Sequence, residues 1–246
     1  MGRKYWWKSV ISFLIVLTLM PLMSILSGVT HNYLEDSIIY YVTMGVGLLG
    51  LLLLIFGSTI RSDSGKAIYG LFGAFFVWTG WVESIFDYYC TRFGLGFTEI
   101  LPVTAGLCAV MAVFYVCVQK TKLNAAVAAF SKFCFYLWTV KIITYFLFDE
   151  AFFGPDSYIT LGFGALCLII FFFLFAGQLS YKEWGSNMKE AITSAFAFWT
   201  AVDIARAAGY LPDVWTDPFT NTIPAMVIVG VFAISSLAAV LTPRAR

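Results

Sequence analysis

Residues 38–60, IIYYVTMGVGLLGLLLLIFGSTI, decide the class of this protein, because they form an apolar run without a single charged side chain. A helix that crosses a bilayer needs about 20 consecutive, mostly apolar residues. Similar runs recur along the chain, which is 61% apolar and only 12% charged, with a mean hydropathy of +0.86. Soluble domains carry about 25% charged residues. The sequence therefore predicts an all-α integral membrane protein.

Eight segments are long and apolar enough to form transmembrane helices. They lie near residues 9–28, 38–60, 67–90, 100–119, 123–148, 157–181, 190–210 and 220–242. The strands of a membrane β-barrel would instead show alternation over about 10 residues, and the sequence has no such alternation. The connections between the segments are short. We therefore expect a single polytopic membrane domain over residues 1–246.

The charged residues are divided unequally between the two sets of connections. One set, together with both ends of the chain, holds the basic residues Arg3, Lys4, Lys8, Arg61, Lys66, Lys120, Lys122, Lys182, Lys189, Arg244 and Arg246. The other set holds Arg92 and the acids Glu35, Asp36, Glu99, Asp149, Glu150, Asp156, Asp213 and Asp217. Cytoplasmic loops carry an excess of Lys and Arg. We expect a multi-pass protein of the plasma membrane or the bacterial inner membrane, with both termini in the cytoplasm.

Threonines recur at nearly constant intervals within the apolar segments. The intervals are 61, 60 and 61 residues in one set and 61, 56 and 62 in a second; the sets are Thr18, Thr79, Thr139 and Thr200, then Thr43, Thr104, Thr160 and Thr222. A fixed period indicates one structural unit used several times. The sequence thus predicts four αα-hairpins of about 60 residues each, all inserted in the same direction, at 8–63, 65–120, 122–182 and 187–244. We expect the threonines to act as packing residues that bond the preceding turn or a neighbouring helix.

Five charged side chains lie inside the predicted helices, on the outer side of the membrane centre. They are Glu83, Asp87, Lys141, Asp203 and Arg206. An ionised group at the bilayer centre costs ~2.5–3.5 kcal/mol on insertion scales, so these residues need partners or a function. Counted from the repeated threonines, Glu83, Lys141 and Asp203 lie within roughly 3 Å of the same depth.

Two interpretations of this cluster remain open. In the structural one, Glu83 pairs with Lys141 and Asp203 with Arg206, so that the pairs hold the helices in register, while Asp87 lies near the outer water. In the functional one, the five residues form a polar pocket open to the outside, in which the surplus acid binds a cation or a proton.

The sequence lacks the usual catalytic and metal-binding patterns. His31 is the one histidine and is predicted in an outer loop, so we expect no haem or His-ligated metal from this chain alone. The five cysteines, Cys90, Cys108, Cys117, Cys134 and Cys167, show no C-x-x-C spacing. Phosphate loops and serine elbows are not present either. We therefore expect no catalysis by this chain, and the identity of any cofactor stays open.

Three further features give local expectations. The acids of Asp36-Ser37, Asp156-Ser157 and Asp217-Pro218 are expected to cap helix N-termini. Lys132 is expected to extend its ammonium group to the cytoplasmic surface. Seven glycines are expected to let neighbouring helices approach closely: Gly45, Gly47, Gly50, Gly70, Gly73, Gly162 and Gly164.

The leading functional hypothesis is a non-catalytic polytopic membrane subunit that packs with partner proteins, lipids or hydrophobic cofactors in a larger membrane assembly. The expected partners are the lipid bilayer and other membrane subunits or further copies of the chain, and not nucleic acid, because the net charge is only +1. The alternative is a small cation, proton or solute transporter or channel that uses the intramembrane acid/base cluster. A sensor or receptor is a third hypothesis, for which the short cytoplasmic loops offer little signalling surface.

Overall fold

Helices account for the regular structure of the residues that the computed structural model describes, 5–121, 124–211 and 222–241. Their bounds are α1 (Trp6–Tyr33), α2 (Asp36–Thr59), α3 (Asp63–Val77), η2 (Trp78–Asp87), α4 (Tyr88–Arg92), α5 (Phe97–Thr121), α6 (Ala125–Phe148), α7 (Tyr158–Gln178), α8 (Trp184–Ala207) and α9 (Thr222–Leu241). Because α3, η2 and α4 are continuous, the described chain forms eight long rods. The all-α class predicted from composition is confirmed for these residues.

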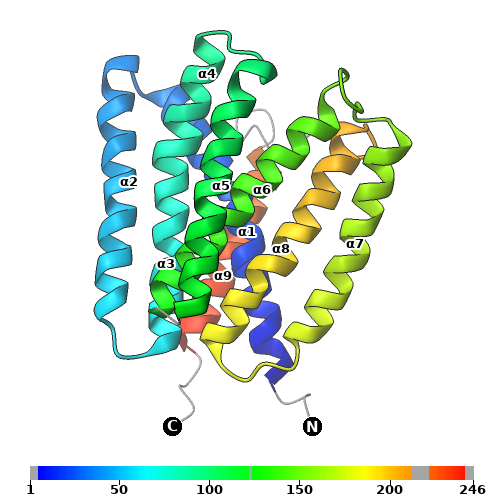
Figure 1. Cartoon of the computed structure of the whole chain (residues 1–246). Coiled ribbons are helices and arrows are strands. Elements are labelled where there is room, and N and C mark those ends of the chain that lie inside the picture. The colour runs from blue at the N-terminus through cyan, green and yellow to red at the C-terminus, as the bar shows by residue number, and fades with distance from the viewer. Residues whose placement is uncertain (1–4, 122–123, 212–221, 242–246) are drawn as a thin grey trace.

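Seven of these rods are long and apolar enough to cross a membrane. The exception is α8, which spans 24 residues but carries Lys189, Glu190, Asp203 and Arg206. The structure therefore supports a multi-pass membrane protein, and the eighth span stays a prediction. We call the end of the bundle where α1 begins and α9 ends the proximal end, and the opposite end the distal end (Figure 1).

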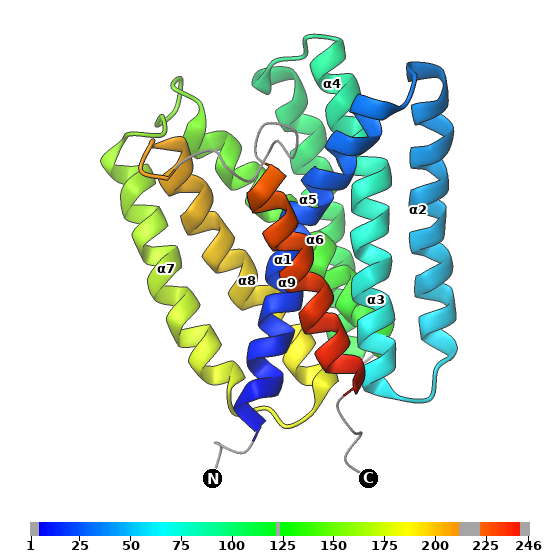
Figure 2. The ribbon, with the colours of Figure 1, turned by 180° about the vertical axis from the view of Figure 1, so that it is seen from behind.

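Four rods form the centre of the bundle. These are α1, the rod of α3 and η2, α6 and α8; α3 packs on α6, α6 on α8, α8 on α1, and α1 on η2, so the contacts close a ring. The other four rods lie outside this ring. In Figure 1, α2 and α7 form opposite edges of the molecule, and Figure 2 shows α9 crossing α1 on the far side.

Each outer helix packs mainly on the inner helix that follows it in the sequence. Thus α2 packs on α3, α5 on α6 and α7 on α8, while α9 packs on α1 and completes the circuit. The helices joined through the distal connections, α1 with α2 and α6 with α7, contact each other little. Every proximal connection between described helices therefore joins two helices that also pack together.

Glycines allow the closest of these contacts. A Cβ atom on Gly50 of α2 would lie 2.6 Å from the carbonyl oxygen of Gly73 in α3, and one on Gly80 would lie 2.5 Å from the carbonyl oxygen of Thr43. Such distances are possible only without side chains, as is common where membrane helices pack. The expectation was wrong for Gly45 and Gly162, because no atom lies within 4 Å of a Cβ at either position. Both glycines point away from neighbouring helices.

The apolar core fills the centre of the ring. Leu19, Leu71, Phe133, Ile192 and Phe196 are each less than 2% exposed. The rings of Phe133 and Phe196 pack edge to face with their centroids 5.5 Å apart, an arrangement that aromatic pairs favour. These residues come from all four inner rods, so their side chains fill the space that the ring encloses.

Helix capping differs from the prediction that acids would do it. Ser157, not Asp156, caps α7, because it immediately precedes the first helical residue and its hydroxyl accepts a bond from the Thr160 backbone N–H at 3.1 Å. At the start of α2, Glu35 is the N-cap residue and makes no side-chain cap bond; Asp36 is the first helical residue, and its side chain lies outside the described part. Asp217 and Pro218 lie outside the described residues.

Two further residues lie elsewhere than predicted. His31 belongs to the last turn of α1 and not to a loop, and it is partly buried. Lys132 does not extend to the surface: it is 7% exposed, and its Nζ lies 3.7 Å from Oε2 of Glu190 on the neighbouring α8. The ammonium group of Lys132 therefore points to α8, where the Glu190 side chain is 39% exposed.

Candidate functional site

A cavity of about 340 Å³ lies on the axis of the ring, in its distal half. All four inner rods line it: α1, η2, α6 and α8 contribute Met20, Pro21, Met23, Ser24, Trp78, Glu83, Leu137, Val140, Lys141, Thr144, Trp199, Asp203 and Arg206. We call it the distal cavity. Four of the five charged residues singled out from the sequence lie in it. The fifth, Asp87, is the last residue of η2, and its side chain is outside the described part.

One ion pair lies on the α8 side of the distal cavity. Nη2 of Arg206 lies 3.4 Å from Oδ1 of Asp203, one helical turn earlier, and the two side chains are 23% and 26% exposed. A pair at this spacing lies on one face of a helix. Because both side chains also line the cavity, they present a carboxylate and a guanidinium group to whatever occupies it.

Glu83 lies in the opposite wall, and its carboxylate accepts hydrogen bonds from side chains of α1 and η2. The Ser24 hydroxyl of α1 donates to its Oε1 at 3.2 Å, and the Trp78 indole N–H donates to its Oε2 at 3.1 Å. Trp78 and Glu83 lie five residues apart in η2, which is π-helical. Hydrogen bonds in a π-helix join residues five apart, and π-helical turns occur often at functional sites. The wide turn therefore places both side chains on the cavity face.

Lys141 and Thr144 of α6 form the third polar wall. Nζ of Lys141 lies 5.3 Å from the centre of the Tyr145 ring, within the range of a cation–π contact. The Thr144 hydroxyl donates to the carbonyl oxygen of Val140 at 3.0 Å. The pairing of Lys141 with Glu83 that the sequence suggests stays a prediction.

Three inner rods each carry a tryptophan directly before a repeated threonine, and two of these, Trp78 and Trp199, line the cavity. The rings of Trp78 and Trp138 pack edge to face with centroids 4.9 Å apart. The Trp199 indole donates to the carbonyl oxygen of Leu17 at 2.7 Å, which ties α8 to α1. These contacts fix large, rigid side chains between the cavity and the core.

The first set of repeated threonines makes one type of hydrogen bond. Each of Thr18, Thr79, Thr139 and Thr200 donates its hydroxyl to the carbonyl oxygen four residues earlier, at 2.8 to 2.9 Å. In the second set, Thr43 and Thr104 do the same. Thr160 differs and donates to the carbonyl oxygens of Leu147 and Gly154. Thr222 is the first residue of α9 and is exposed.

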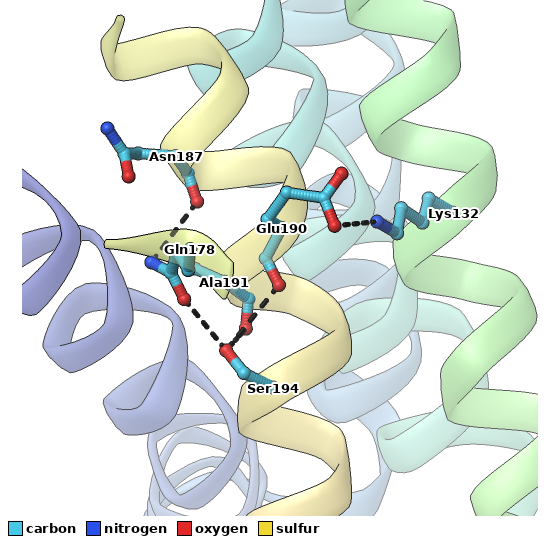
Figure 3. A network of polar contacts seen from close by, with 6 residues as sticks. All are labelled: Lys132, Gln178, Asn187, Glu190, Ala191 and Ser194. Atoms are coloured by element: carbon cyan, nitrogen blue, oxygen red, sulfur yellow. Dashed lines mark hydrogen bonds and ion pairs between the residues drawn. The ribbon is translucent and has the colours of Figure 1, made fainter. Parts of the chain in front are cut away.

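Sequence reasoning missed a buried polar network at the proximal end (Figure 3). Gln178 of α7 is 1% exposed; its amide donates to the carbonyl oxygen of Ser9 at 2.9 Å and accepts from the Ser194 hydroxyl at 2.9 Å. The Ser9 hydroxyl donates to Asn187 Oδ1 at 2.6 Å. The network joins α1, α7 and α8. A lone amide within the apolar run 157–181 was the signal that could have revealed it.

The distal cavity combines charges of both signs with apolar and aromatic walls. Ligand sites commonly have mainly apolar walls and a few polar groups that orient the ligand. Among the described residues, no group of three or more His, Cys, Asp or Glu side chains could hold a metal ion. The groups present can accept and donate hydrogen bonds and offset charge.

No family model, curated protein or solved structure matches this chain.

Proposed function

We propose that this protein is a membrane transport protein that binds a small zwitterionic solute, of amino-acid size, in the distal cavity. The observation that carries the proposal is the convergence of Glu83, Lys141, Asp203 and Arg206 on one cavity between four helices. Ionisable groups within membrane segments commonly mark substrate and ion pathways. Two acids and two bases complement a solute that carries one ammonium and one carboxylate group.

The size of the cavity supports a small solute. Its 340 Å³ lies at the lower end of the range of about 300–1,000 Å³ that is usual for ligand sites. Glu83 lines the cavity and offers a carboxylate to an ammonium group. Arg206 and Lys141 offer cations to a carboxylate. A pure cation site would need the surplus acid of Asp87, whose side chain is not described.

The floor of the cavity favours a carrier over an open channel. Leu19, Phe133 and Phe196 are nearly inaccessible and lie toward the proximal end from the cavity. A solute in the cavity would reach the proximal side only after the inner rods move apart. Transport through this protein would therefore require alternation between two arrangements of the ring.

Binding in lipid nanodiscs tests the proposal. Thermal unfolding is followed with each standard amino acid, and with ethylamine and propionate as controls that carry one charge each. We expect at least one amino acid to stabilise the protein and neither control to do so. Glu83→Gln should abolish the effect, whereas Glu99→Gln, an exposed acid of α5 outside the cavity, should leave it intact.

Uptake into proteoliposomes then separates binding from transport. The amino acid that stabilises the protein should accumulate inside vesicles that contain the unaltered chain and not in those with Glu83→Gln. Absence of any stabilising amino acid would refute the zwitterion site. Binding without uptake would indicate that the protein is a solute receptor and not a carrier.

We also infer that the fold is built from four same-direction αα-hairpin repeats. The cyclic packing supports this, because each inner rod receives the outer helix of the preceding hairpin and α9 of the last hairpin packs on α1 of the first. The matching hydrogen bonds of Thr18, Thr79, Thr139 and Thr200 support it as well. The repeat explains how the cavity comes to lie on the ring axis.

A subunit of a larger membrane assembly is the second candidate function. The observation that favours it is α5, of whose most apolar stretch only 6% is buried, against 17–22% for the other outer helices. Val103, Val110 and Val113 are each more than half exposed there. Native mass measurement after mild detergent extraction tests this candidate. A second polypeptide or a further copy that remains bound to the chain would support this candidate. A lone monomer would count against it.

A further inference from the structure

A second cavity, of about 760 Å³, lies at the proximal end between α1, α3, α8 and α9. We call it the proximal cavity. Lys8 and Ser64, near the starts of α1 and α3, and Lys182, in the connection before α8, line its mouth. Ile15, Leu71 and Met188 lie deeper, along α1, α3 and α8, and form an apolar wall. A polar mouth above an apolar wall at the predicted membrane surface matches an amphiphile and not a fully polar solute.

Lys8 is the strongest feature of the mouth. The residue is only 7% exposed, and its Nζ donates to the carbonyl oxygen of Lys182 at 3.2 Å. It lies between 5.1 and 5.9 Å from the ring centres of Tyr5, Trp7 and Trp184. No carboxylate of the described residues pairs with it. A buried ammonium group without an anionic partner is costly, and a bound anion would lower that cost.

Two helices begin at the same mouth. α3 begins at Asp63 and α8 at Trp184, and the Gly185 backbone N–H donates to the Ser64 hydroxyl at 3.0 Å, which ties the two starts together. The N-terminal end of a helix carries a partial positive charge of roughly half an elementary charge. Both helix starts therefore add to the positive potential of Lys8 and Lys182.

Two acids lie near the mouth and limit this potential. Glu183 lines the cavity and is exposed to solvent. Asp63 faces Lys66 at 3.5 Å and does not line the cavity. The mouth therefore holds two lysines against one acid, and the more buried of these charges is Lys8.

We propose that the proximal cavity binds one anionic phospholipid of the adjoining leaflet. The phosphate lies at Lys8 and Lys182, and one acyl chain lies along Ile15 and Leu71. Basic pockets between transmembrane helices are suited to anionic headgroups, and the cytoplasmic leaflet is rich in such lipids. Because the lipid contacts α1, α3, α8 and α9 together, it stabilises the closed ring of inner rods.

The test uses the full chain in a mild detergent, titrated with phosphatidylglycerol and followed by thermal unfolding and native mass measurement. Phosphatidylcholine and inorganic phosphate serve as the other two ligands. We expect phosphatidylglycerol alone to raise the unfolding temperature and to remain bound. Lys8→Gln should weaken its binding about tenfold, Lys8→Arg should largely retain it, and Lys120→Gln, an exposed lysine of α5, should not alter it.

Two variants keep the test decisive if Lys8→Gln does not fold. Lys182→Gln alters only an exposed residue of the mouth, and Ala239→Phe narrows the apolar wall without a change of charge. Both should weaken phosphatidylglycerol binding. Unchanged binding in both would overturn the proposal. Equal protection by phosphatidylcholine would also overturn it, because binding would then not require a net negative charge on the headgroup. Equal protection by inorganic phosphate would overturn it as well, because binding would then not require an acyl chain.

Discussion

The Trp78 indole N–H and the Glu83 carboxylate meet at 3.1 Å across a single turn of π-helix. In an α-helix, residues five apart lie on different faces, so this bond depends on the wider π turn. Trp78 also packs on the Trp138 ring of α6. One side chain therefore links the position of the carboxylate to the packing of two inner rods.

Trp78→Phe tests this link, because it removes the N–H donor and keeps most of the aromatic ring. A hydrogen bond to a charged group contributes about 1.5–3 kcal/mol, so we expect a lower unfolding temperature and weaker solute binding. The measurement is thermal unfolding in nanodiscs with and without the solute. Trp6→Phe, at a 54% exposed position at the proximal end, is the matched control. Equal behaviour of the two variants would contradict the role given to Trp78.

The Asp203–Arg206 pair should show coupling in a double-mutant cycle. The side chains are about one quarter exposed, so the pair lies between a surface pair and a buried one. We expect Asp203→Asn and Arg206→Gln each to cost about 1–2 kcal/mol, and the double variant to cost less than the sum. Unfolding measurements in detergent give the cycle. Strict additivity would show that the two side chains do not stabilise each other.

The polar network at the proximal end should matter more for stability than any charged residue. Asn187 accepts a bond from Ser9 and donates to the carbonyl oxygens of Tyr181 and Glu183 at 3.1 and 3.0 Å. Asn187→Ala removes all three side-chain bonds at a residue that is fully buried, and we expect a loss of about 2–4 kcal/mol. Ser180→Ala removes an exposed hydroxyl of the same connection and should change stability by less than about 0.5 kcal/mol. A small effect of Asn187→Ala on unfolding would contradict the structural role of the network.

The sequence was sufficient to predict the class of this fold. Long apolar runs such as 38–60 require a bilayer. The similar depths that helix rise predicts for Glu83, Lys141 and Asp203 agree with their position around one cavity. The partners of each helix could not be predicted in the same way. The outer helices are apolar on all sides, so their sequences do not distinguish the face that packs on a neighbour from the face that meets lipid.

Local features were harder to predict because they depend on distant parts of the chain. Lys132 is buried only because Glu190 of α8 lies beside it, and Gln178 is satisfied by Ser9 of α1. Neither partner is close in sequence. The π-helical segment Trp78–Asp87 was not predicted either.

Gly80 should be far less tolerant of substitution than Gly45, although both lie in apolar helices. A Cβ at Gly80 would lie 2.5 Å from a carbonyl oxygen and 2.6 Å from a backbone nitrogen of α2, neither of which can rotate away. We expect Gly80→Ala to cost about 1–3 kcal/mol. Gly45→Ala meets no atom within 4 Å and should leave stability unchanged or raise it slightly. Thermal unfolding of the two variants is the measurement, and equal destabilisation would contradict the close approach of η2 to α2.

Circular permutation tests the closed ring and the hairpin repeat together. A chain that starts at Asp63 and joins the original ends by a flexible linker keeps every hairpin intact, because the new ends replace a proximal connection. α2 then becomes the last helix and packs on α3, the first, as α9 packs on α1 in the natural order. We expect this permutant to insert, fold and retain the distal cavity, measured by its unfolding temperature and solute binding.

A permutant opened between α1 and α2, at Glu35, is the comparison. It splits a hairpin, and it would have to insert with its basic loops on the opposite side of the membrane, so we expect it to insert and fold poorly. The repeat would be contradicted if both permutants folded equally well or if only the second did.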